Sequence, residues 1–325
     1  MNLKGWIELD GVRLSPADVE RMLKAGPEPL TRCGGEFLLT WDGCTARDAF
    51  GIMPGPVPPG AVCCGGRAVA RIAPDPPSCT LEEAIITAVD LRSDEGVVAF
   101  SGGVDSGLIA GLARLPCVAV GIEGSHDIIW ATKAALMMKL DLEVVTPTEE
   151  EVVEALARVV RVIPDPANPV EASIATTLFF VAARARELGH TRILAGQGAD
   201  ELFGGYARYL SSPDLAAELE RDVADHERQR ARDQAVAALH GTYFSMPYLD
   251  ARVVRAAQAI PSGEKVRGEV RKRPLREVAE HHIPIEVAQA EKKAMQYGSG
   301  IWRTIQGLAR RNGHRRVAEY LKTLL

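Results

Sequence analysis

Three absences narrow the classes of protein to which this chain of 325 residues can belong. No apolar run reaches the roughly 20 residues that span a bilayer, and nothing resembles a secretory signal, so we expect a cytoplasmic protein without a membrane segment. The six cysteines form no C-x-x-C pair and no Cys/His cluster at zinc spacing, so we expect reduced thiols that are mostly buried. The formal net charge of −5 provides no general attraction to nucleic acid.

What the chain does contain is the run Ser101-Gly-Gly-Val-Asp-Ser106, between an apolar stretch at 97–100 and residues at helical spacing. This order predicts a strand, a tight loop and a helix N-terminus. Gly102 and Gly103 allow close approach to unpaired N–H groups, and the two serines add hydroxyl donors, so we predict a phosphate site. A carboxylate there, Asp105, implies a bridging Mg²⁺. The alternative is a plain turn with Asp105 as helix cap, and the Walker pattern is absent.

The chain divides at a proline-rich stretch, Pro74-Asp-Pro-Pro77. Residues 1–78 hold short alternating segments separated by Gly and Pro, with one helix beginning after Ser15, and we expect a small β-rich domain there. A capping box at Thr80-Leu-Glu-Glu83 then begins a second domain, residues 79–325.

Strands and helices alternate in the second domain. Alternation predicts a doubly wound parallel sheet with ligand sites at the carboxyl ends of its strands. The expected strands are 117–122, 142–146 and 192–195, and the expected helices are 127–138, 149–160 and 170–188. At the first of these strand ends, backbone groups near Val120 and Gly121 could read an adenine edge. A simple β-to-α turn is the equal alternative.

A second glycine-rich run, Ala195-Gly-Gln-Gly-Ala-Asp-Glu-Leu-Phe-Gly-Gly-Tyr206, follows a predicted strand directly. Gly196 permits close backbone approach, and Asp200 lies where a second carboxylate could complete a Mg²⁺ shell with Asp105.

Together these two glycine-rich runs resemble the synthetase domain of asparagine synthetase and its relative β-lactam synthetase. Further similarity lies in Ser245-Met-Pro-Tyr-Leu-Asp250 and in Lys272 before Pro274-Leu-Arg276. The resemblance implies an α/β fold of the adenine-nucleotide α-hydrolase (PP-loop ATPase) type with a helical C-terminal part. It also implies that a carboxylate attacks the α-phosphate of ATP, releasing pyrophosphate, and that ammonia or an amine then displaces AMP.

The resemblance assigns one further residue and leaves one role open. Lys292, six residues before Gly298, matches the family lysine that neutralises charge on the reacting groups. The family's glutamate or tyrosine between two glycines is replaced here by Gln197, and an amide cannot act as a general base. Either the nucleophile arrives without its proton, or another acid serves, with Glu201 and Asp233 as the candidates. The identities of the amine and of the carboxylate remain open.

The N-terminal domain resembles the end of the class II glutamine amidotransferase domain, through Gly34–Asp42 and Ala46-Arg-Asp-Ala-Phe-Gly-Ile-Met-Pro54. Removal of Met1 would expose Asn2, which has no thiol, so we expect no glutaminase activity. An unrelated β-domain is the alternative. Candidate partners are a glutaminase subunit that supplies ammonia and a second copy of the chain in a homodimer. The rival functions are a tRNA-modifying enzyme and a non-catalytic ATP-binding subunit of an amidotransferase.

Overall fold

The computed structural model describes residues 1–291 and 298–325. They form two compact units. The first contains Met1–Asp94, Gln197–Val223 and Ser245–Arg271, and the second contains Glu95–Gly196, Ala224–Phe244 and Lys272–Leu325. The predicted boundary at residue 78 falls between the last strand of the N-terminal sheet and the next helix, and it stays a prediction.

The first unit contains a six-stranded antiparallel sheet in the order β2-β1-β3-β4-β5-β6. Ile7, Phe37 and Leu39 are buried in its core. The predicted helix after Ser15 is present, and the Ser15 side chain accepts a hydrogen bond from the Asp18 N–H. The elements are β1 (Asn2–Leu9), β2 (Val12–Arg13), α1 (Pro16–Leu23), η1 (Glu28–Arg32), β3 (Gly34–Trp41), β4 (Cys44–Arg47), β5 (Ala61–Cys64) and β6 (Arg67–Arg71).

This sheet corrects the prediction that all six cysteines are reduced. Cys44 on β4 lies opposite Cys64 on β5, and the two form a disulfide with a Cα–Cα separation of 4.0 Å. The prediction was wrong because strand register, rather than sequence spacing, brings the two sulfurs together. Four cysteines are free thiols: Cys33 and Cys117 are buried, Cys63 is half-buried and Cys79 is exposed.

Helices complete the first unit. The predicted capping box at Thr80 is present, since its side chain accepts from the Glu83 N–H at the start of α2. The elements are α2 (Leu81–Asp90), α7 (Ala199–Phe203), η2 (Ala207–Ser211), η3 (Pro247–Leu249), α9 (Ala251–Ala259) and α10 (Ser262–Lys265). Helix α8 (Leu215–Ala238) begins in the first unit and ends in the second.

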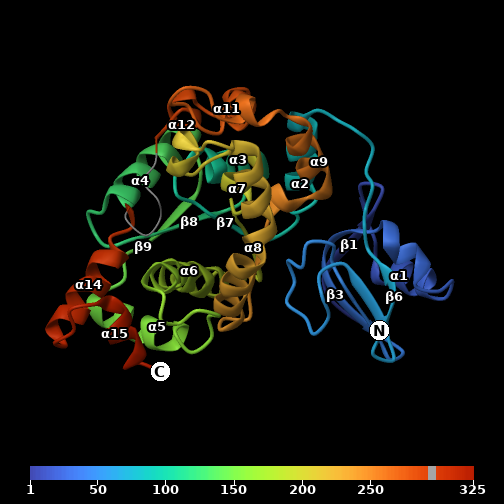
Figure 1. Ribbon diagram of the computed structural model, residues 1–325, viewed down its shortest axis with the longest axis horizontal. Helices are drawn as coiled ribbons and strands as arrows, with labels where there is room; N and C mark the ends of the chain where they lie inside the picture. The colour runs from blue at the N-terminus through green and yellow to red at the C-terminus, as the bar shows by residue number, and fades with distance from the viewer. Residues whose placement is uncertain (292–297) are drawn as a thin grey trace. The chain divides into compact units, whose positions relative to one another are not determined.

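The second unit is built on a five-stranded sheet in the order β11-β10-β7-β8-β9, with parallel pairing from β10 through β9. Figure 1 shows α3 and α4 above this sheet and α5 and α6 below it. The strands are β7 (Val97–Ala99), β8 (Cys117–Val120), β9 (Leu142–Val145), β10 (Arg192–Leu194) and β11 (Tyr243–Ser245). The helices are α3 (Val104–Ala113), α4 (His126–Met138), α5 (Glu149–Val159), α6 (Pro169–Glu187), α11 (Arg273–Glu280), α12 (Ile285–Ala288), α14 (Ile301–Arg311) and α15 (Val317–Lys322).

The strand order places a topological switch point between β7 and β10. From β7 the chain adds β8 and β9 on one side, and it then returns to add β10 on the other side of β7. Doubly wound sheets bind ligands where the strand order reverses, beyond the carboxyl ends of the strands. The predicted alternation and parallel sheet are therefore confirmed, and the loops after β7 and β10 meet at the expected position for a ligand.

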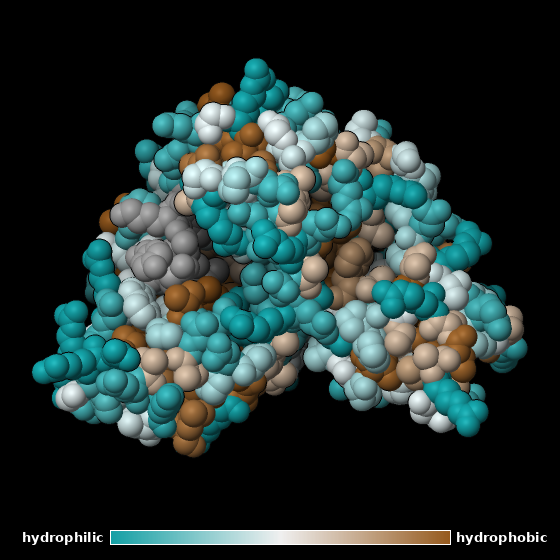
Figure 2. Space-filling model, viewed as in Figure 1, coloured by the Kyte–Doolittle hydropathy of each residue, from teal (hydrophilic) through white to brown (hydrophobic). Residues whose placement is uncertain are grey.

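Within the described ranges, no helix is long and apolar enough to cross a bilayer. The face drawn in Figure 2 is mostly hydrophilic, and its hydrophobic side chains form small separate patches. Scattered exposed apolar residues of this kind are ordinary on a protein surface.

Candidate functional site

The loop after β7 leads into the N-terminus of α3, as the sequence predicts, and its role as a phosphate site stays a prediction. Gly103 is the N-cap of α3 and makes no side-chain cap hydrogen bond, which leaves the first N–H groups of the helix to other partners. The Ser101 N–H donates to Ser106 Oγ at 3.1 Å, and the two hydroxyl oxygens lie 3.0 Å apart. These bonds hold both hydroxyls at the positive end of the helix dipole.

Gly102 turns this loop in the left-handed region, at φ +73°. Its carbonyl accepts a hydrogen bond from Trp130 Nε1 on α4 at 2.8 Å. A Cβ at this position would lie 2.8 Å from Trp130 Cδ1, which is closer than carbon atoms pack. Glycine is therefore required both by the backbone angle and by the indole that supports the loop.

Asp105 lies in the first turn of α3 and pairs with a lysine from a distant part of the chain. Lys272 Nζ is 2.6 Å from Asp105 Oδ2, and the lysine is 7% exposed. Because Gly103 is the N-cap, the alternative role of Asp105 as helix cap is wrong. Lys272 itself is the N-cap of α11 with φ +57°, a conformation that costs a non-glycine residue about 1 kcal/mol. Strained residues of this kind cluster at functional sites.

Lys272 is the site residue to which the sequence assigned no role. Asp105 and Lys272 are separated by 167 positions, and neither local pattern nor composition links them. The available signal was the resemblance of the stretch beginning at Lys272 to a family motif.

Gly196 brings the loop after β10 against the loop after β7. A Cβ on Gly196 would lie 2.9 Å from Asp105 Cβ and 3.5 Å from the Ser106 nitrogen. The residues that lie together here in the second unit are Ser101, Gly102, Gly103, Asp105, Ser106, Gly196 and Lys272. The close approach of the Gly196 backbone to a bound phosphate stays a prediction.

Two backbone N–H groups in the stretch after β8, where the sequence predicts an adenine contact, already form hydrogen bonds within the protein. The Gly121 N–H donates to the Val145 carbonyl at 3.1 Å, and the Ile122 N–H donates to the Ser299 carbonyl at 2.8 Å. An adenine edge would therefore have to be read by other backbone groups near Val120 and Gly121, and this role stays a prediction.

Gln197, Asp200 and Glu201 belong to the first unit, around the short helix α7. Gln197 and Asp200 are half-buried. Glu201 is 3% exposed and accepts a hydrogen bond from Tyr206 Oη at 2.5 Å. The Asp200 carbonyl accepts the N–H groups of the glycines that end α7. Their predicted catalytic and metal-binding roles stay predictions.

Segment 245–250 packs against the loop that contains Gly198, because an added Cβ on Gly198 would lie 2.8 Å from Leu249 Cδ2.

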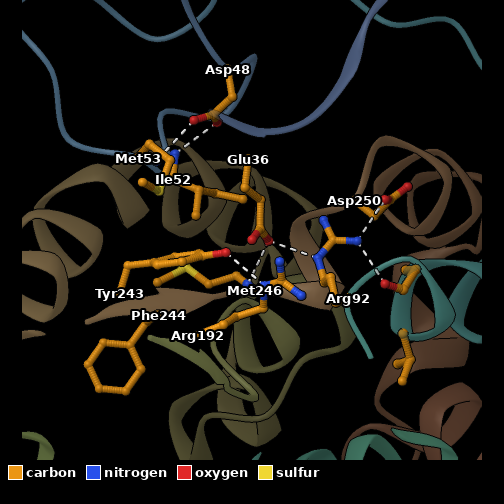
Figure 3. Close-up of polar contacts among 12 residues, drawn as sticks. Glu36, Asp48, Ile52, Met53, Arg92, Arg192, Tyr243, Phe244, Met246 and Asp250 are labelled. Atoms are coloured by element: carbon orange, nitrogen blue, oxygen red, sulfur yellow. Dashed lines mark hydrogen bonds and ion pairs between the residues drawn. The ribbon is translucent and has the colours of Figure 1, made fainter. Parts of the chain in front are cut away.

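The segment 245–250 is held in turn by the N-terminal sheet. Figure 3 shows Glu36 between Met246 and Arg92: it accepts from the Met246 N–H at 2.9 Å and from Arg92 Nε at 2.8 Å. Arg92 also donates to Asp250 Oδ2 at 3.1 Å. The N-terminal sheet therefore positions the segment that packs against Gly198.

Asp233, the second candidate for the amine's proton, is fully buried in the second unit. Arg232 Nε donates to its Oδ1 at 2.7 Å, and Arg232 also pairs with Glu171 at 3.0 Å.

Lys292 lies outside the described residues. The described Gly298, six positions later, packs against the carboxyl group of Asp127, since an added Cβ would lie 2.0 Å from Asp127 Oδ1. The spacing that led to Lys292 thus ends at a position that only glycine fits.

The carboxylate beside the loop after β7 suits a cation that is bound partly by the protein and partly by a ligand. Within 1–291 and 298–325, no three His, Cys, Asp or Glu side chains gather closely enough to hold a metal ion by themselves. Mg²⁺ typically takes one or two carboxylates and completes its shell with substrate phosphates and water. Asp105, beside the phosphate loop, fits that description.

The chain matches the family model described as Asparagine synthase over residues 80–232 and 225–322. It is 34% identical over 269 residues to a protein of Methanocaldococcus jannaschii named as a glutamine-hydrolysing asparagine synthetase, covering 69% of this chain and 50% of that one. It is 26% identical over 229 residues to asparagine synthetase B of Escherichia coli, covering 62% and 41%. The chain thus spans half or less of the length of these relatives.

Among solved structures, NMN synthetase from Francisella tularensis is matched over 72% of this chain and 97% of its own, at 14% identity and a TM-score of 0.29. A likeness that slight adds nothing to the fold described above. The family model covers most of the chain and includes the phosphate loop, the Gly196 loop and Lys272. The chain therefore belongs to the asparagine synthase family.

Proposed function

We propose that the chain is an ATP-dependent ligase that forms AMP and pyrophosphate, activating a small-molecule carboxylate as an acyl-adenylate for attack by ammonia or an amine. The observation that carries the proposal is the Asp105–Lys272 pair at the N-terminus of α3, beside Gly196. A lysine and a helix N-terminus at a switch point provide the positive charge that a triphosphate requires, and the carboxylate provides a ligand for a Mg²⁺ that bridges to the phosphates.

Each residue has a proposed task. The first N–H groups of α3 and the hydroxyls of Ser101 and Ser106 bind the phosphates, and Lys272 neutralises the charge that develops on the departing pyrophosphate. Asp105, with Asp200, would hold Mg²⁺ against the phosphates, and the ion supplies further neutralisation. Lys292 stabilises the charged oxygens of the acyl centre.

The second half-reaction requires an amine that has lost its proton. Gln197 orients the nucleophile by hydrogen bonds, because its amide has no useful pKa. Glu201 or Asp233 accepts the proton. The nitrogen is supplied by ammonia from solution, by a glutaminase subunit or by an organic amine. We include in this proposal that two copies of the chain associate as a homodimer.

The decisive experiment measures AMP and pyrophosphate release from ATP with a panel of amino and dicarboxylic acids, each with ammonium, with glutamine and with neither. Acid-dependent pyrophosphate release, with amide formed only when ammonium or an amine is present, supports the proposal. Release that requires tRNA and no acid would instead identify a tRNA-modifying enzyme. ATP binding without turnover under every condition would identify a non-catalytic subunit.

A further inference from the structure

An open cavity of about 440 Å³ lies within the first unit, between the start of α8 and the segment that joins α9 to α10. Small-molecule sites commonly have volumes of roughly 300–1,000 Å³ and mostly apolar walls with a few placed polar groups. The larger aliphatic side chains that line it are Leu202, Leu219, Val223 and Ile260.

Lys265 is a positively charged residue of this cavity that the proposed function does not use. It is 7% exposed, and no carboxylate in the described part of the chain forms an ion pair with it. Burial lowers the pKa of its ammonium group. A buried ammonium is unfavourable unless an anion compensates it, so a ligand carboxylate in the cavity would supply the compensation that the described chain does not.

The other polar walls have the opposite charge. Glu201, which accepts the hydrogen bond from Tyr206, and the exposed Glu220 both line the cavity. Two carboxylates would repel a ligand with several negative charges, such as a phosphate ester. A cation on one wall and anions on another instead match a zwitterion, whose two charges are each placed opposite a protein charge.

We propose that this cavity binds a free α-amino acid with an apolar side chain. Its carboxylate pairs with Lys265, its ammonium group pairs with Glu220, and its side chain packs against Leu219, Val223 and Ile260. The cavity is a binding site in its own right, and the proposal does not depend on ligase activity.

The test is calorimetric titration of the full chain with L-leucine, compared with L-leucinamide and 4-methylpentanoate. Each analogue keeps the side chain and lacks one charge of the zwitterion. We expect saturable binding of L-leucine, and at least about tenfold weaker binding of both analogues, since each leaves a protein charge without a partner. Absence of saturable L-leucine binding, or equal binding of L-leucinamide, would overturn the proposal.

Two variants locate the ligand. Lys265→Met removes the charge at similar volume and should weaken L-leucine binding at least about tenfold, whereas Lys24→Met, at an exposed lysine, should leave it unchanged. Val223→Trp fills the cavity and should abolish binding. Thermal unfolding establishes that each variant is folded. Undiminished binding by folded Lys265→Met and Val223→Trp would place the ligand elsewhere and refute this assignment.

Discussion

Lys272 places a positive charge beside Asp105 in the loop after β7. Its ammonium group lies 2.6 Å from Asp105 and is held at the start of α11 in a left-handed backbone conformation. We predict that Lys272→Met lowers pyrophosphate release about 100-fold or more, because removal of one group that stabilises transition-state charge costs roughly 2.7–4 kcal/mol. The measurement is the rate of pyrophosphate release at saturating ATP.

Two companion variants define the cause. Lys272→Arg keeps the charge but changes the donor geometry, so we expect partial activity. Lys322→Met removes an exposed lysine and should have no effect. Normal turnover by folded Lys272→Met would show that the pair with Asp105 is structural.

Asp48 predicts a pH dependence of stability. The carboxyl group is fully buried, and burial raises its pKa from 3.8 to about 6, although it accepts hydrogen bonds from the Ile52 and Met53 N–H groups. Between these two pKa values the folded chain binds the proton and the unfolded chain does not. This group therefore lowers the free energy of unfolding as pH rises from about 4 to about 6, by roughly 3 kcal/mol.

Urea unfolding of Asp48→Asn measures this contribution. The stability advantage of the unsubstituted chain over the variant should be largest near pH 4 and shrink by pH 7, since asparagine does not ionise. Asp90→Asn, at an exposed site on α2, should give a curve parallel to that of the unsubstituted chain. A pH-independent difference for Asp48→Asn would contradict the raised pKa.

At the scale of elements, the sequence predicts those features whose hydrogen bonds join residues close together in the chain. The caps at Ser15 and Thr80 and the strand, loop and helix around residues 97–113 are present because their hydrogen bonds lie within a few residues of one another. Pairings between distant segments carry no local signal. The Cys44–Cys64 disulfide depends on strand register, and the Asp105–Lys272 contact depends on how α11 packs near α3.

The junction between β7 and α3 provides a test of loop shape. Gly102→Ala combines a positive φ with a Cβ 2.8 Å from Trp130 Cδ1. Gly189→Ala has a similar φ, +87°, with no atom within 4 Å of its Cβ, so it measures the backbone cost alone, about 1 kcal/mol. We predict that both variants are destabilised but that only Gly102→Ala loses ATP affinity, as measured by equilibrium binding. Equal ATP affinities would show that the loop tolerates displacement of the indole.

At the scale of the whole molecule, the first unit is assembled from three separate parts of the chain. Buried ion pairs join the first of these parts to the third. Arg92 pairs with Glu36 of its own part and with Asp250 of the third part, and Arg252 of the third part pairs with both Asp250 and Glu8. Glu36 and Arg92 lie on either side of the predicted boundary near residue 78, which stays a prediction. The β-rich N-terminal segment and the 245–252 stretch share one buried network.

This shared network predicts that the N-terminal sheet and α9 unfold together. Glu36→Gln leaves Arg92 with a weakened partner, and breaking one side of a buried pair costs roughly 3–5 kcal/mol. Native-state hydrogen exchange, followed by mass spectrometry, should therefore show faster exchange by the same factor in peptides from β3 and from α9. Glu20→Gln, at an exposed position on α1, should change neither. Faster exchange in β3 alone would mean that the N-terminal sheet opens independently, and the network would then position segment 245–250 without linking its stability to the sheet.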